Sequence, residues 1–127
     1  MFTLSKRSID NLKGVHQDLV KVVNRAIAIS VVDFIVVEGL RTSTRQHELY
    51  NKGLSKTLNS RHLTGHAVDL APVIDGEVRW SWPPFYGIAD AMKKAAKELR
   101  VSLVWGGDWI TFKDGAHFEL DKIRYPK

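Results

Sequence analysis

The sequence predicts an α+β domain in which helices pack on a small, mainly antiparallel sheet. Two stretches, residues 5–29 and 82–99, have the apolar spacing of helices. Short apolar or alternating runs, which are typical of strands, occupy residues 34–37, 66–73 and 101–105. Because helices come first, a sheet follows and a further helix packs on it, we expect an α+β fold rather than a strictly alternating one.

The N-terminal part is expected to form two helices and a buried strand. Apolar residues recur at helical spacing from Ile9 to Ile27, and Gly14 interrupts them. The predicted helices therefore cover about 5–13 and 16–29. The apolar, β-branched run that follows predicts the strand.

A short third helix is expected from Ser43 to about Asn51. Ser43 with Gln46 three residues later is a capping-box signal for its start. Residues 52–61 are polar and aperiodic, which predicts a loop. This helix and loop separate the first predicted strand from the second.

The second strand is expected to continue into a hairpin. Asp75 and Gly76 supply the turn after it, and the chain returns through Val78 and Trp80. A proline pair at 83–84 suits the first turn of the long helix. After that helix, strands are expected at 101–105 and 116–120, joined by a turn at 106–109. The tryptophans outside this turn are assigned to packing: Trp80, Trp82 and Trp105.

Composition restricts the class of protein. The 127 residues, 44% hydrophobic and 26% charged, suit one domain spanning 1–127 with a single core, by default a monomer. The chain has no cysteine, which excludes disulfides, cysteine-bound metals and thiol catalysis. Any metal site must use histidine and carboxylates.

Charge and hydropathy bear on partners and location. The net charge of +5 favours an anionic partner, but the basic residues are scattered, and no nucleic-acid recognition motif is present. No apolar run approaches the ~20 residues that span a bilayer, and the N-terminus lacks the apolar segment of a signal peptide. We expect synthesis in the cytoplasm.

Two short segments, 60–69 and 114–119, combine histidines with carboxylates. A catalytic zinc takes three protein ligands and keeps one position open. His62, Asp69 and His117 make one such set, in which Asp114 stays unligated as the proton acceptor that activated water requires. A second interpretation pairs His62 with His66 on a helix, although Gly65 and the following strand disfavour a helix there. The remaining histidines are expected to be structural or exposed: His16 and His47.

Residues 60–69 fill every position of the S-x-H-x-x-G-x-A-x-D pattern, and 114–117 fill D-x-x-H. The chain thereby resembles the zinc D-alanyl-D-alanine carboxypeptidase and L-alanyl-D-glutamate endopeptidase family. Gly39-Leu40-Arg41-Thr42 and Gly106-Gly107-Asp108-Trp109 resemble its phage endolysin branch. The resemblance extends from about Leu12 to Leu120.

The resemblance implies zinc on His62, Asp69 and His117, with Asp114 as general base and His66 on a variable position. It implies that Arg41 stabilises the oxyanion, a role suited to a fixed cation. The alternative for Arg41 is a structural ion pair at a strand end.

For each of the other candidate site residues, two interpretations are open. By resemblance, Ser60 binds substrate backbone, or it only caps the loop. Gln46 reaches the substrate or serves only the capping box. Trp109 contacts substrate, beside Asp108 in a cleft wall, or belongs to the core. Glu119 either orients a zinc-ligand histidine or faces outward from its strand, and we favour the outward orientation.

The expected function is that of a peptidoglycan-degrading zinc metallopeptidase that cuts the L-alanyl–D-glutamate bond of the stem peptide. The loop 110–113 is short, which favours an open groove and internal cleavage, although Lys113 or Arg61 could serve as a carboxylate clamp. The alternatives are a D-alanyl-D-alanine carboxypeptidase or dipeptidase, and, in another class, a non-catalytic zinc-containing binding module. An endolysin of this kind would be synthesised in the bacterial cytoplasm and would depend on a separate holin to reach the cell wall in the periplasm.

Overall fold

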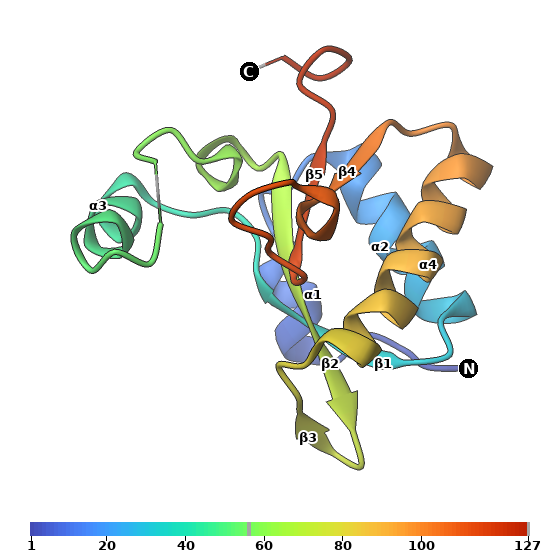
Figure 1. Ribbon diagram of the computed structural model, residues 1–127. Coiled ribbons are helices and arrows are strands. Elements are labelled where there is room, and N and C mark those ends of the chain that lie inside the picture. The colour runs from blue at the N-terminus through green and yellow to red at the C-terminus, as the bar shows by residue number, and fades with distance from the viewer. Residues whose placement is uncertain (56, 127) are drawn as a thin grey trace.

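The computed structural model describes residues 1–55 and 57–126, and it has the predicted α+β architecture (Figure 1). The helices are α1 (Lys6–Asn11), α2 (Gln17–Ile29), α3 (Ser43–Asn51) and α4 (Trp82–Leu99). The strands are β1 (Asp33–Glu38), β2 (Ala67–Ile74), β3 (Glu77–Val78), β4 (Leu103–Trp105) and β5 (His117–Leu120). Two single-turn 3₁₀ helices cover Arg61–Thr64 and Gly106–Asp108.

The sheet is antiparallel at each of its pairings, with strand order β1-β2-β5-β4 and with β3 returning along the end of β2. Its central pair is β2 and β5. In their register Asp69 lies opposite His117, and Ala67 lies opposite Glu119. Two residues that are 48 positions apart in the sequence are thereby held side by side on adjacent strands.

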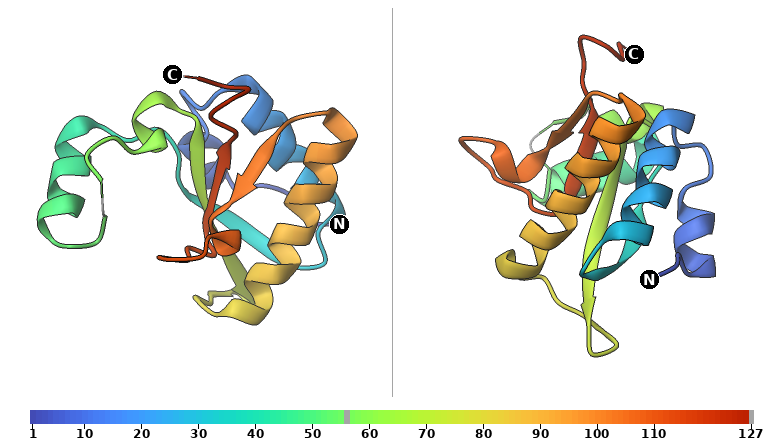
Figure 2. Two further views of the ribbon diagram at one scale, coloured as in Figure 1. Left: turned by 45° about the horizontal axis from the view of Figure 1, so that its top comes forward. Right: turned by 90° about the vertical axis from the view of Figure 1, so that its right-hand side faces the viewer.

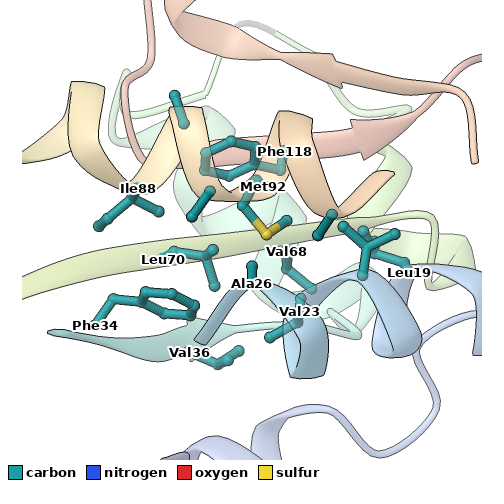
Figure 3. Close-up of a cluster of buried hydrophobic side chains, with 14 of the residues drawn as sticks. Leu19, Val23, Ala26, Phe34, Val36, Val68, Leu70, Ile88, Met92 and Phe118 are labelled. Carbon is teal, nitrogen blue, oxygen red and sulfur yellow. The ribbon is translucent and has the colours of Figure 1, made fainter. Parts of the chain in front are cut away.

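Alternation along β2 and β5 separates a core face from a polar face. Val68 and Leu70 of β2, with Phe118 of β5, meet side chains of α2 and α4 such as Val23 and Met92 (Figure 3). Because successive side chains of a strand point to opposite faces, Asp69 and His117 project away from this core. Both views in Figure 2 show α2 and α4 side by side on the core face.

The edge strand β1 is covered by α1. Asn11 donates from Nδ2 to the carbonyl oxygens of Val36 and Val37, at 2.8 and 3.2 Å, and Ser8 Oγ accepts the amide of Val36 at 2.9 Å. These bonds occupy backbone groups that an open sheet edge would leave unpaired.

Three local expectations are corrected. The side chain that caps α3 is Thr42, which accepts the amide of Arg45 at 3.1 Å, so Ser43 and Gln46 form no capping box. The strand β3 ends at Val78, before Trp80. Of the tryptophans assigned to packing, Trp105 is buried, but Trp80 is 61% and Trp82 38% exposed.

Among the described residues, none of the helices combines the length and the apolar character needed to cross a bilayer.

Candidate metal centre and active site

The turn that carries His62 is shaped by its two ends. Ser60 caps it, since its Oγ accepts the amide of His62 at 3.2 Å. Gly65 ends it in the left-handed conformation, with φ of 74°. A Cβ at Gly65 would lie 2.4 Å from the carbonyl oxygen of Gly14, so both the backbone angle and the close approach require glycine. The serine and glycine of the pattern therefore place the histidine.

Three potential ligand atoms converge at the polar face of the sheet. Nε2 of His62 and Nδ1 of His117 each lie 3.3 Å from Oδ1 of Asp69. The ligand atoms of the three residues all lie within 4.8 Å of one another. Two imidazole nitrogens and one carboxylate oxygen form a donor set suited to a catalytic zinc.

The outward ring nitrogens of both histidines are engaged. His62 donates from Nδ1 to the carbonyl oxygen of Gly39 at 2.8 Å, and His117 donates from Nε2 to Oε1 of Glu119 at 2.8 Å. In the neutral form of each ring, these bonds fix the tautomer that leaves the lone pair on the inward nitrogen. Nε2 of His62 is buried, and in the described part of the chain it has no hydrogen-bond partner. A buried, unpaired acceptor aimed at a carboxylate and a second imidazole fits a metal ligand.

Protonation in the metal-free protein follows from these contacts. Burial alone would raise the pKa of Asp69, but the imidazoles of His117 and His62, each with a nitrogen 3.3 Å from its Oδ1, hold that pKa well below its usual range. Burial alone would lower the pKa of His117, yet the hydrogen bonds to Asp69 and Glu119 raise it to about 9. A carboxylate flanked by imidazoles is thus stabilised in its charged form, which is the form that binds a cation.

Asp114 stands beside this cluster without belonging to it. Its backbone amide donates to Gly106, and its Oδ1 accepts the amide of Ala116 at 3.2 Å. A Cβ at Gly106 would lie 2.5 Å from the carbonyl oxygen of Asp114, so this glycine lets the loop approach. Partial burial of the carboxyl group and the negative charge of Asp69 raise the pKa of Asp114. The environment is that of a carboxyl group suited to proton transfer.

Arg41 is fixed on the other side of the cluster. Its Nε and Nη2 donate to the two carboxylate oxygens of Glu38, at 2.8 and 2.7 Å. Its Nη1 donates to Oε1 of Gln46 at 2.7 Å, and Nη2 lies 3.6 Å from Oδ2 of Asp69. The structural ion pair considered from the sequence is therefore present. Glu38 was missed, although an acidic residue at the end of a strand three positions before the arginine was a signal.

Gln46 is 1% exposed, and both ends of its amide are used within the protein. Beyond Arg41, its Nε2 donates to Oγ of Ser55 and to the carbonyl oxygen of Thr57. Gln46 thus connects α3 to the loop after it and to Arg41, and within the described residues both its amide oxygen and its amide nitrogen are engaged. Among the other expected contact residues, the Ser60 side chain lies 3.5 Å from Nη1 of Arg41.

Two loops form the walls of a cavity beside the cluster: the loop after α3 on one side and the loop after β4 on the other. The Trp109 ring is half-buried and lies 5.2 Å, between centroids, from that of His117. Asp108 instead points to solvent and pairs with Lys93 at 2.7 Å. A cavity of about 760 Å³ lies between the walls; it reaches the three candidate ligands, and its lining also includes Arg41, Asp114, Trp109, Leu54, Phe112 and Lys113.

The outward orientation favoured for Glu119 is wrong. Glu119 is 7% exposed and faces His117, because β5 places residues 117 and 119 on the same side of the sheet. Arg61 lies behind it, with Nε 3.8 Å from Oε2 of Glu119, and donates to the carbonyl oxygens of Leu120 and Tyr125. These contacts occupy Arg61 in holding the C-terminal segment.

The remaining histidines lie outside the cluster. The helical pair of His62 and His66 does not form, since Gly65 ends the turn between them, and the ring of His66 instead lies 5.6 Å from that of His16. Nδ1 of His16 accepts the amide of Asp18 at the start of α2, and His47 is exposed on α3.

The helix-backed antiparallel sheet and the His–Asp–His cluster beside a free carboxylate define a metallopeptidase. A family model described as phage L-alanyl-D-glutamate peptidase matches residues 1–123. The chain belongs to this family, as the sequence patterns indicated.

Individual relatives agree. The L-alanyl-D-glutamate peptidase of Escherichia phage T5 is 36% identical over 128 residues, which cover 98% of this chain and 93% of the relative. The peptidoglycan L-alanyl-D-glutamate endopeptidase CwlK of Bacillus subtilis is 32% identical over 102 residues, covering 70% and 61%.

Solved structures extend the likeness to three dimensions. The crystal structure of the Serratia marcescens L-Ala D-Glu endopeptidase ChiX superposes with a TM-score of 0.92 at 49% identity and covers 96% of this chain and 92% of ChiX. The vancomycin-resistance D,D-dipeptidase VanXYg has a TM-score of 0.55 at 19% identity, with 84% and 50% covered. The latter likeness is one of fold.

Proposed function

We propose that this enzyme hydrolyses the L-alanyl–D-glutamate bond of the peptidoglycan stem peptide, with zinc held by His62, Asp69 and His117. The observation that carries the proposal is the buried, unpaired Nε2 of His62, which faces Asp69 and has His117 beside it. Relatives at 36% and 49% identity are named for this bond and cover more than nine-tenths of the chain.

Zinc, when bound, supplies a Lewis acid that polarises the scissile carbonyl group and lowers the pKa of water. Asp114 takes the proton from the attacking water molecule and then delivers it to the amine of the leaving D-glutamate residue. The hydrogen bond from the backbone amide of Ala116 to Oδ1 keeps the carboxyl group of Asp114 oriented. Its raised pKa brings the carboxyl group closer to the value that suits both steps at neutral pH.

Arg41 faces the carbonyl oxygen as negative charge develops on it. A guanidinium group remains charged throughout, and Glu38 and Gln46 hold it in one orientation. A cation fixed in advance stabilises the transition state without having to reorganise. Gln46 acts here by supporting Arg41, so the proposal gives it no direct substrate contact.

Ser60 and Trp109 complete the assignment as substrate contacts. Ser60 borders the cavity at the cap of the His62 turn, and Trp109 borders it from the opposite loop. The two walls contribute apolar groups, Leu54 on one side and Phe112 on the other. An extended peptide lying between them would place its scissile bond over the cluster.

A free carboxylate beside the cluster argues against a non-catalytic zinc module, because a structural metal needs no proton acceptor. Cleavage of D-alanyl-D-alanine is the alternative within the class. It requires a clamp for the free carboxylate of the substrate. Arg61 is buried and already hydrogen-bonded to two backbone carbonyl oxygens, so of the two candidate clamps only Lys113, which lines the cavity, could serve. The relatives named for the L-alanyl–D-glutamate bond favour internal cleavage.

Metal dependence and lysis test the proposal together. Purified wild-type protein should contain zinc and clear a suspension of purified peptidoglycan. A chelator should abolish the clearing, and added zinc should restore it. His117→Ala should lose both zinc and activity, whereas His47→Ala, which removes an exposed histidine on α3, should keep both. Full activity of metal-free His117→Ala protein would exclude the assigned site.

A further inference from the structure

Three large aromatic side chains lie exposed where the chain enters α4. Trp80 is 61%, Trp82 38% and Tyr86 55% exposed, and we call these three residues the aromatic corner. The rings of Trp82 and Tyr86 lie 5.9 Å apart. Packing alone does not account for this surface, since contiguous exposed aromatic groups are typical of interaction sites.

Two buried aromatic side chains support the aromatic corner from beneath. Phe85 lies beneath it, with its ring 6.4 Å from Trp80 and 5.8 Å from Trp82. Trp105 supports the other side, at 5.7 Å from Tyr86. Supported rings lose little conformational freedom when a ligand stacks on them, which favours binding.

The buried rings of Phe85 and Trp105 also connect the aromatic corner to the active site. The Phe85 ring packs so closely on Gly115 that a Cβ there would lie 2.7 Å from it. Trp105 donates from Nε1 to the carbonyl oxygen of Gly115 at 2.8 Å. Gly115 directly follows the proposed base Asp114. Figure 1 shows the first turn of α4 beside the 106–115 loop, and both project to the same side in the right-hand view of Figure 2.

Substrate chemistry supplies a ligand of matching position. In peptidoglycan the L-alanine of the stem peptide is joined directly to the sugar that carries it. A bond cut after this residue therefore lies one amino acid from the glycan strand. If the bond lies at Asp114, we expect the sugar one residue further along the substrate, near the rim of the active site.

Charge points to the same ligand. Two cations near the corner are paired: Lys93, which lies over Trp105, with Asp108 at 2.7 Å, and Arg79, which precedes Trp80, with Glu77 at 3.6 Å. An uncharged, amphipathic partner fits such a surface better than an anionic one. Sugar rings present C–H faces to the electron-rich faces of aromatic rings, and stacking also removes apolar area from water.

We propose that the aromatic corner binds the glycan strand of peptidoglycan while the attached stem peptide lies in the active site. The inference rests on the proposed function, because the position of the sugar follows from the bond that is cut. It makes the enzyme selective for stem peptides that are still attached to glycan.

The test compares two substrates that differ only in the sugar: a disaccharide–tetrapeptide and the free tetrapeptide. The measured quantity is the kcat/KM value for the disaccharide–tetrapeptide divided by that for the free tetrapeptide. Trp80→Ala combined with Tyr86→Ala should lower this ratio about tenfold, in the range that loss of aromatic contacts produces. Ile123→Ala, which removes an exposed apolar side chain near the C-terminus, should leave the ratio at the wild-type value. An unchanged ratio in the double variant, or an equal fall on both substrates, would overturn the proposal.

A binding measurement separates this inference from the proposed function. Calorimetric titration with peptide-free glycan strands should show binding to the wild type and a loss of binding in the double variant, whichever bond the enzyme cuts. Absence of binding to the wild type would overturn the inference. A second copy of this chain is the other possible occupant, and sedimentation of the wild type and the double variant tests for it. A wild-type dimer that becomes monomeric in the double variant would make the aromatic corner an interface between copies and would overturn the inference.

Discussion

His62 and His117 turn different ring nitrogens toward the same carboxylate oxygen of Asp69. His62 uses Nε2 and His117 uses Nδ1, each at 3.3 Å. The other nitrogen of each ring sets its tautomer: Nδ1 of His62 donates to the carbonyl oxygen of Gly39, and Nε2 of His117 donates to Glu119. The protein thus orients both imidazoles before a metal binds, which reduces the cost of assembling the site.

Glu119 is expected to control the orientation of His117. Glu119→Ala should weaken zinc binding by about 10- to 100-fold, the usual scale for losing such a partner. Glu119→Gln should cost less, because its amide oxygen still accepts from Nε2. Competition with a chromophoric chelator measures the zinc affinity of each variant. Wild-type affinity in Glu119→Ala would mean that packing alone orients His117.

Asp114 is expected to matter for chemistry and not for metal binding. Asp114→Asn keeps the size of the side chain but cannot accept a proton at neutral pH. It should retain zinc and thermal stability while kcat falls by about 100-fold or more. Metal analysis and steady-state kinetics on a defined muropeptide test this. Activity within a few-fold of wild type would assign the base to another group.

Stability of the metal-free protein should decrease as the pH rises. The folded pKa of His117, about 9, exceeds its usual value of 6.5, so its contribution is fully present below pH 6.5 and is lost as pH rises through about 9. Thermal unfolding of chelator-treated protein between pH 6.5 and 9.5 should show a falling Tm. His117→Ala is the control and should lack this component. Identical slopes in both proteins would contradict the cause given for the raised pKa.

Zinc should reverse this trend, because metal and proton compete for the same nitrogen. The gain in Tm that added zinc produces should increase with pH over this range.

Much of the architecture follows from local sequence patterns. Apolar spacing located α2 and α4, and the alternation around Asp69 and His117 located the two central strands. The candidate ligands were found because two short segments combine histidines with carboxylates, and the first of these segments is a local turn capped by serine and ended by glycine. Such features depend on neighbours in sequence.

Features that depend on distant neighbours were not predictable in the same way. The amide of Gln46 finds partners in Arg41 and in a loop with no sequence signal of its own. Trp80 carries the apolar character of a core residue, yet the short β3 ends before it and leaves it exposed. Both cases depend on tertiary placement. Glu119 differs from them: it lies two residues after His117 on β5, so strand alternation already predicted that the two side chains share a face.

The central claim concerns the bond that is cut, and mass spectrometry of the products from intact peptidoglycan tests it most directly. The account predicts released peptides with a new N-terminal D-glutamate, or its amidated form, and L-alanine retained on the glycan. Release of free D-alanine as the main product, with the L-alanyl–D-glutamate bond intact, would contradict it.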